Sequence, residues 1–112
     1  MPPILYYQNS TGSVVEIESS GPPLGGFINF KYEKCDYKLS PSDVIVVMTD
    51  GFAERRNNAK EILGWDKGKE ILSRIKDQAS NRIIAQFVEA NDNWGEENPQ
   101  DDDITFVVIK VK

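Results

Sequence analysis

The sequence predicts a small mixed α+β domain, and three observations support that prediction. Two apolar runs rich in β-branched residues, Val44–Met48 and residues 104–109, are typical of strands. Between them, two stretches space their apolar residues as helices do. Ahead of both, two short segments flank a polar turn. Strands that enclose a helical pair indicate an α+β or layered α/β architecture, and 112 residues suffice for one such domain.

The N-terminal part of the chain is predicted to form strands. Residues 4–8 and 14–18 flank the polar, glycine-containing stretch 9–13, which indicates a β-hairpin. Residues 20–26 are rich in glycine and proline and predict a loop. Residues 27–39 alternate imperfectly, which predicts a strand with a bend or bulge. Val44–Met48 is apolar throughout, which indicates a strand buried on both faces.

The second half is predicted to hold two helices and a last strand. Asp66 is positioned to cap a helix running to about residue 77, although Gly68 weakens its first turn. Ser80 or Asn81 can cap a second helix, whose apolar stripe is Ile83, Ile84, Phe87 and Val88. The acidic stretch 92–99 is balanced between a solvated loop and part of a site. Residues 104–112 are predicted to form the last strand.

Composition excludes several classes of function. A net charge of −5 without a basic stripe argues against a nucleic-acid partner. The sequence holds no histidine, which removes Ser-His-Asp, Cys-His and histidine-zinc chemistry from this chain. Cys35 is the only cysteine, so a reducing, cytoplasmic location is expected. No apolar run has transmembrane length, and no membrane contact is expected from this segment.

Two acidic segments adjoin the two apolar strands. Asp50-Gly51 follows Val44–Met48, and Asp101, Asp102 and Asp103 precede the last strand. Asp-Gly also makes hairpin turns, but residues 52–58 are too polar to be a returning strand. If the two strands are neighbours, the carboxylates meet at one rim, where their repulsion favours a bound cation. Oxygen ligands without thiolate or imidazole select Mg²⁺ or Mn²⁺, which suits phosphoryl transfer or hydrolysis.

An ordered set of motifs resembles a known family. The motifs are Gly-Pro-Pro-Leu-Gly at 21–25, Leu-Ser-Pro-Ser-Asp at 39–43, Met-Thr-Asp-Gly at 48–51 with Glu54, Arg55 and Asn57, Glu-Ile-Leu-Gly at 61–64, and Asp-Asp-Ile-Thr-Phe-Val-Val at 102–108. In order and spacing the chain resembles the bacterial metal-dependent protein phosphatases of the PPM or PP2C class. It is most similar to their sporulation-phosphatase and sigma-regulator (stressosome-pathway) branch.

The resemblance implies a fold and a chemistry. The fold is an α-β-β-α sandwich of antiparallel sheets with helices outside. Two Mn²⁺ or Mg²⁺ ions activate a water that attacks phosphoserine or phosphothreonine on a regulatory protein. The motifs carry Asp50 and Asp102 over as metal ligands, with Asp101 and Asp103 as alternatives in register and the Gly51 backbone as a further ligand. Glu54, Arg55 and Arg56 are candidates for substrate or partner contacts, within a segment 52–64 that could form a flap.

Further metal ligands of the family have no counterpart before Asp50. Residues 1–112 are therefore expected to be the C-terminal portion of a phosphatase domain, inactive or nearly so alone. The alternative is a non-catalytic interaction module of phosphatase ancestry, and a receiver-like domain is disfavoured because residues 4–8 lack its acidic pair. Sheet edges left without neighbours could also drive self-association.

Overall fold

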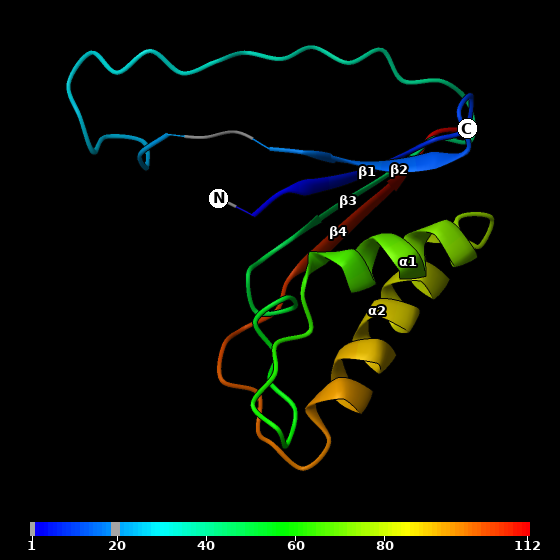
Figure 1. The fold of residues 1–112 in the computed structure, drawn as a ribbon. Helices are drawn as coiled ribbons and strands as arrows, with labels where there is room; N and C mark the ends of the chain where they lie inside the picture. The colour runs from blue at the N-terminus through cyan, green and yellow to red at the C-terminus, as the bar shows by residue number, and fades with distance from the viewer. Residues whose placement is uncertain (1, 19–20) are drawn as a thin grey trace.

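The computed structural model describes residues 2–18 and 21–112, which form one antiparallel sheet with two helices on one of its faces (Figure 1). The elements in chain order are β1 (Ile4–Gln8), β2 (Ser13–Ile17), β3 (Val44–Met48), α1 (Trp65–Ile75), α2 (Ser80–Gly95) and β4 (Phe106–Lys110). The predicted mixed α+β class is confirmed. No helix in the described ranges combines the length and apolarity that crossing a bilayer requires.

The sheet order is β2-β1-β3-β4, and every neighbouring pair is antiparallel. The predicted hairpin is present as β1 and β2, with its second strand one residue earlier than expected. Strand β3 pairs with β4 from Val44↔Lys110 to Met48↔Phe106. The two apolar runs singled out in the sequence are therefore direct neighbours, although residues 44 and 106 are 62 positions apart in number.

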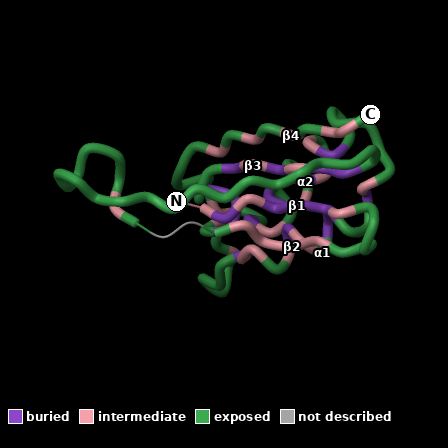
Figure 2. The backbone as a smooth tube through the Cα atoms, turned by 90° about the horizontal axis from the view of Figure 1, so that it is seen from above, coloured by how far each residue is buried: buried purple, intermediate pink, exposed green. Residues whose placement is uncertain are grey.

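One face of the sheet holds the core. Alternate residues of β1 and β3 point to the helices and are buried, as period-two strands require. They meet the buried residues of the two helices, and Figure 2 shows this interior. Each such side chain contributes roughly 1.5–3 kcal/mol by leaving water. The core residues from the sheet and helices are Leu5, Tyr7, Val44, Val46, Met48, Ile71, Leu72, Ile75, Ile83 and Phe87.

The other face of the sheet is also apolar but less covered. Ile45 and Val47 of β3 are only partly buried, whereas the sequence predicted a strand buried on both faces. On β4, Val107 is 50% exposed and Ile109 is 46% exposed. Residues 33–39 pass over part of this face, where Tyr37 meets Tyr6 edge-on at 6.0 Å between ring centroids.

The strand predicted over residues 27–39 is wrong. This segment contains turns at its start and no regular structure from 30 to 40, and Figure 1 shows it as a long arm on the side of the sheet away from the helices. Most of its side chains are exposed. No neighbouring strand among the described residues offers hydrogen bonds to its backbone, so the strand that its alternation predicts does not form.

Both helices form where expected, but their starts differ from the prediction. Gly64 and Ala79 occupy the cap positions, and neither helix has a side-chain cap hydrogen bond. Gly68 lies in the first turn of α1, where it is buried and a Cβ would lie 3.1 Å from Leu5 Cδ1 and 3.4 Å from Phe52 Cε1. Glycine thus lets α1 lie close to the sheet and to Phe52.

Helix α2 is longer than the predicted apolar stripe. It continues to Gly95, so residues 92–95 are helical rather than loop. Its buried face is Ile83, Phe87, Asn91 and Gly95 at four-residue spacing, whereas Val88 is 42% exposed. The extension carries the helix end toward the segment that follows Asp50.

Candidate metal and phosphate site

The site is built where β3 and β4 end. The backbone ladder stops at Met48↔Phe106, and Thr49 makes the next connection. Its amide donates to the Thr105 carbonyl at 3.2 Å. Its hydroxyl accepts a hydrogen bond from the Thr105 amide at 3.0 Å and donates to the Asp103 carbonyl at 3.1 Å. The segment before β4 is thereby held beside the segment after β3.

Gly51 permits this close approach. A Cβ at position 51 would lie 2.6 Å from the Asp103 carbonyl oxygen and 2.9 Å from Ile104 Cγ1, which no real side chain tolerates. Residues 50–54 then turn, with the Glu54 amide donating to the Asp50 carbonyl at 3.0 Å. Asp50-Gly51 is therefore a turn that leaves the sheet and not the tip of a hairpin.

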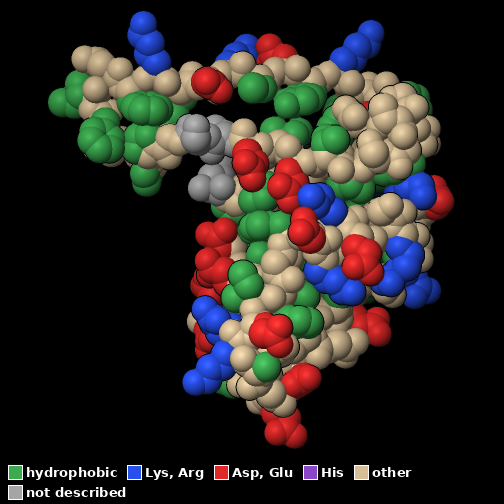
Figure 3. All heavy atoms as spheres, in the orientation of Figure 1, with side chains coloured by type: hydrophobic (Ala, Val, Ile, Leu, Met, Phe, Trp, Pro, Cys, Tyr) green, Lys and Arg blue, Asp and Glu red, His purple; other side chains and the backbone are tan. Residues whose placement is uncertain are grey.

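A cavity of about 510 Å³ opens beside this turn. Two acidic residues that precede β4, Asp101 and Asp102, line it together with Glu54, Arg55 and Arg56 from the segment after β3. Gly51 and Ile62 complete the lining. Figure 3 shows acidic side chains gathered on the edge of the molecule where β3 ends, next to basic ones. Six of the eight residues singled out in the sequence thus share one cavity.

Asp50 and Asp103 flank the cavity without lining it. Asp50 is exposed, and its carboxylate makes no hydrogen bond or ion pair with any described residue. Asp103 contributes main-chain atoms, because its carbonyl accepts from Thr49 and its amide donates to Asp102 Oδ1 at 2.8 Å. Glu54 and Arg56 are exposed, and Arg56 Nη1 donates to the Lys60 carbonyl at 2.7 Å.

Arg55 is not a solvated flanking arginine. It is half-buried, and its guanidinium donates to Asn91 Oδ1 at 3.3 Å and to the Asn98 carbonyl at 2.9 Å. Asn91 Nδ2 in turn donates to the Phe52 carbonyl at 3.1 Å. Asn91 was not predicted from the sequence, although it lies four residues after Phe87 on the buried stripe of α2. A polar residue at such a position requires a hydrogen-bond partner, and that was the available signal.

Asp43 is a second residue whose role the sequence analysis missed. It is 2% exposed, and it accepts hydrogen bonds from the Tyr6 hydroxyl at 2.7 Å and from the amides of Asn9 and Ser40, each at 2.9 Å. The two amide hydrogen bonds, then that of Tyr6, lower the pKa of the Asp43 carboxyl. The same contact raises the pKa of Tyr6. Asp43 therefore stabilises the loop at the opposite end of β3.

The donor chemistry suits a hard divalent cation, but the set within this chain is incomplete. Carboxylate oxygens are the ligands that Mg²⁺ and Mn²⁺ prefer. None of the ion pairs among the described residues engages Asp50, Asp101 or Asp102, so their oxygens are free of competing cations there. Within residues 2–18 and 21–112, no three acidic or cysteine side chains are grouped to hold an ion. These residues fit part of a metal site.

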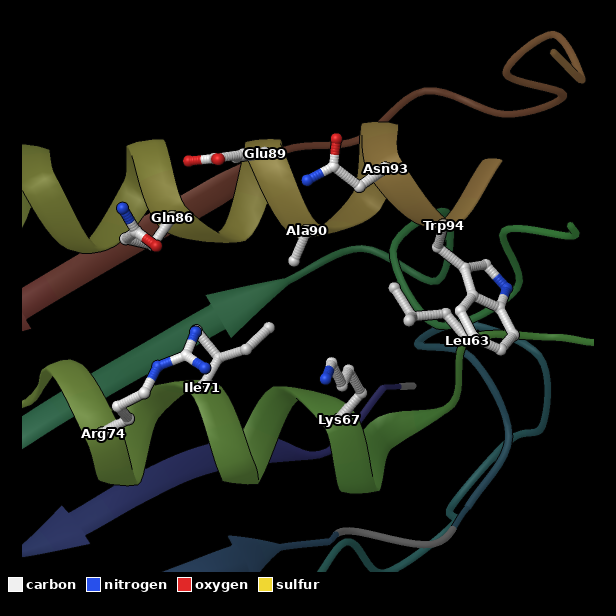
Figure 4. Close-up of a pocket in the computed structure, with 9 residues that line it drawn as sticks. All are labelled: Leu63, Lys67, Ile71, Arg74, Gln86, Glu89, Ala90, Asn93 and Trp94. Atoms are coloured by element: carbon white, nitrogen blue, oxygen red, sulfur yellow. The ribbon is translucent and has the colours of Figure 1, made fainter. Parts of the chain in front are cut away.

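A second cavity, of about 340 Å³, lies between α1 and α2 (Figure 4). Lys67 and Arg74 rise from α1, Glu89 and Asn93 come from α2, and Trp94 closes one end beside Leu63. None of the residues singled out for the metal site lines it.

Solved structures with this fold are phosphatase domains. The SiaA-PP2C domain of Pseudomonas aeruginosa matches with a TM-score of 0.82 and 20% identity, over 98% of this chain and 43% of that one. The phosphatase domain of the cell fate determinant SpoIIE from Bacillus subtilis (Mn presoaked) matches with a TM-score of 0.71 and 20% identity, over 97% and 46%. The chain thus spans less than half the length of these structures, and its α+β fold is that of part of a PP2C domain.

The sequence comparisons give a further result. No curated protein matches the chain at the significance required. The family profile described as Stage II sporulation protein E (SpoIIE), however, matches residues 1–112. The family resemblance predicted from the motifs is confirmed, and with it phosphatase ancestry. The chain belongs to the Stage II sporulation protein E (SpoIIE) family.

Proposed function

We propose that the chain is the C-terminal part of a metal-dependent serine/threonine protein phosphatase and supplies some of its metal ligands. The observation that carries the proposal is the junction at Thr49. It holds Asp50 and the 101–103 segment at one end of the sheet, beside a cavity of about 510 Å³. Family membership and the fold of the matched phosphatase domains support it.

In this proposal Asp50 and Asp102 hold the metal, and Asp101 is the alternative to Asp102. Asp101 and Asp102 line the cavity, and Asp103 stays a further alternative in register, because its hydrogen bonds to Thr49 and Asp102 involve main-chain atoms and leave its carboxylate free to bind metal. Bound Mn²⁺ or Mg²⁺ would lower the pKa of a coordinated water and draw charge from phosphoryl oxygens. The remaining ligands would come from outside residues 1–112.

The chain's own residues would have complementary roles. Arg56 is exposed at the cavity, where its guanidinium can pair with phosphate oxygens of a phosphorylated regulatory protein. Glu54 lies beside it and would disfavour acidic side chains flanking the phosphorylated residue. The cytoplasmic location and the self-association through edge strands β2 and β4 stay predictions.

The test is hydrolysis of a phosphoserine peptide with Mn²⁺ or Mg²⁺ by the chain and by the complete gene product. We expect turnover from the complete gene product and essentially none from the chain, because two or three carboxylates hold a metal pair too weakly. Robust turnover by the chain alone would show that it needs no further ligands. A complete gene product that binds no metal and hydrolyses no phosphopeptide would favour the non-catalytic interaction module.

A further inference from the structure

The segment that carries Asp101 and Asp102 is held at two points. On its C-terminal side, Thr49 binds the carbonyl of Asp103 and the amide of Thr105. On its N-terminal side, Arg55 Nη2 donates to the carbonyl of Asn98 at 2.9 Å. Asp101 and Asp102 lie between these two attachments and line the cavity that Arg55 also lines.

Both attachments start from the loop that carries Asp50. Thr49 directly precedes Asp50, and Arg55 is five residues after it. The 50–55 loop is itself fixed to α2, since Asn91 accepts from Arg55 Nη1 at 3.3 Å and donates to the Phe52 carbonyl at 3.1 Å. The 50–55 loop therefore helps to set the distance between the two acidic segments, together with Asn58, whose amide donates to Glu96 Oε2 at 3.3 Å and whose Oδ1 accepts from Asn98 Nδ2.

The packing around Arg55 is specific. A Cβ built at Gly95 would overlap the Arg55 guanidinium, so the arginine lies directly against the helix backbone, and a larger residue at position 95 would require the guanidinium to move. Its Nε is buried and has no acceptor among the described residues, which leaves Nη1 and Nη2 to make the contacts. A neighbouring contact, Asn98 Nδ2 to Asn58 Oδ1 at 2.8 Å, joins the same turn to residues 52–64.

From this geometry we infer that Arg55 is a positioning residue, which holds Asp101 and Asp102 at the end of the sheet that carries Asp50, where they can bind a metal ion. The inference rests on the proposed function. Two effects oppose each other at this position. The guanidinium repels a cation in the cavity, so removing its charge should strengthen metal binding. Losing its hydrogen bonds releases the 96–102 segment, which should weaken metal binding. The loss of the hydrogen bonds dominates, so removing Arg55 weakens metal binding.

The test is a titration of the chain with Mn²⁺ followed by paramagnetic broadening of backbone amide NMR signals. In wild type we expect the amides of Asp50 and of residues 101–102 to broaden together at millimolar Mn²⁺. Arg55→Ala should require roughly 10-fold more Mn²⁺ to broaden residues 101–102, the size of effect that outer-shell partners have on metal affinity. Gly95→Ala should act in the same direction while keeping the arginine charge, since its methyl group displaces the guanidinium.

Two controls separate the outcomes. Arg82→Ala removes the same charge from an exposed position of α2 and should leave the titration unchanged. Arg55→Lys keeps the charge but cannot make both hydrogen bonds, to Asn91 Oδ1 and to the Asn98 carbonyl. It should therefore behave as Gly95→Ala does. Hydrogen exchange in residues 96–102, measured without metal, should be faster in Arg55→Ala and Gly95→Ala than in Arg82→Ala.

Two outcomes would refute the positioning role of Arg55, and a third would refute the metal site. Wild-type broadening at Asp50 and residues 101–102 that Arg55→Ala and Gly95→Ala leave unchanged would refute the positioning role. Equal rates of hydrogen exchange in residues 96–102 of all variants would also refute the positioning role. A wild-type chain in which Mn²⁺ broadens neither acidic segment would refute the metal site of the proposed function itself.

Discussion

Strand β3 has an aspartate near each end, and the two side chains have opposite environments. Asp43 is buried and accepts three hydrogen bonds, from Tyr6, Asn9 and Ser40. Asp50 is exposed, and its carboxylate has no partner among the described residues. One aspartate holds the fold together, and the other is available to a ligand. Both aspartates adjoin the same strand, so closeness to a strand end does not distinguish them; the hydrogen bonds that each carboxylate accepts do.

The largest expected effect on stability is that of Asp43→Ala. The substitution leaves the Tyr6 hydroxyl and the amides of Asn9 and Ser40 without their acceptor, so the melting temperature should fall by roughly 10 °C or more. Thermal unfolding followed by circular dichroism measures it. Asp36→Ala, at an aspartate whose side chain is 83% exposed, is the control and should change the melting temperature by no more than about 2 °C. Equal falls in melting temperature for Asp43→Ala and Asp36→Ala would contradict the structural role of Asp43.

Gly51→Ala should have the next largest effect. The added methyl group would meet the Asp103 carbonyl oxygen at 2.6 Å and push apart the ends of β3 and β4. Such overpacking costs about 1–3 kcal/mol of unfolding free energy, measured by urea denaturation. Because the strain falls at the acidic end of β3, hydrogen exchange should rise at residues 103–105 before it rises at residues 40–43. Faster exchange at both ends would mean that the two ends of β3 are not independent.

Acid should affect the Asp43 end of β3 selectively. The folded pKa of Asp43 is lower than its ordinary value of 3.8, so the folded state binds this proton less readily than the unfolded state does. Its stabilisation is therefore present above pH 3.8 and is lost as pH falls through the folded pKa. Urea unfolding at a series of pH values should show a steeper acid loss in wild type than in Asp43→Asn. Parallel pH profiles would show that this carboxyl contributes no such dependence.

Asp50→Asn should have the smallest effect on stability. Its carboxylate supports no contact among the described residues, so the unfolding free energy should stay within about 0.5 kcal/mol of wild type. Calorimetric titration of Mn²⁺ should nevertheless show weaker binding than in wild type. Equally weak Mn²⁺ binding by both proteins would show that Asp50 is not a metal ligand, and the contrast of Asp50 with the structural Asp43 would then have no functional meaning.

Apolar patterning predicted most of the fold. Val44–Met48, the 104–109 run and the hairpin were recognisable because period and β-branching act over a few residues. The arm 27–39 was not predicted correctly. An alternating segment forms a strand only where a neighbouring strand offers hydrogen bonds to its backbone, and the sequence pattern does not show whether one is present. The N-cap residues Gly64 and Ala79 were also missed, since packing of the helices on the sheet outweighs the capping preference of Asp66 or Ser80.

The site was only partly predictable from sequence. Asp50 and the 101–103 segment could be named because each adjoins an apolar strand, and the structure places those strands side by side. The roles of Arg55, Asn91 and Asn98 depend on contacts between residues 36 and 43 positions apart in the chain. No local pattern encodes such contacts, and only a buried polar residue such as Asn91 hints at them.

The packing of Gly68 bears on how this protein could be engineered. Replacing a glycine inside a helix with alanine commonly strengthens the helix by about 1 kcal/mol. Here the new methyl group would lie 3.1 Å from Leu5 Cδ1, which is tighter than an ordinary contact, and at ordinary contact distance from Phe52 and Phe87. Leu5 is fully buried in β1. A design that improves helix propensity at this glycine would therefore gain stability only if Leu5 can shift within the core by a few tenths of an ångström.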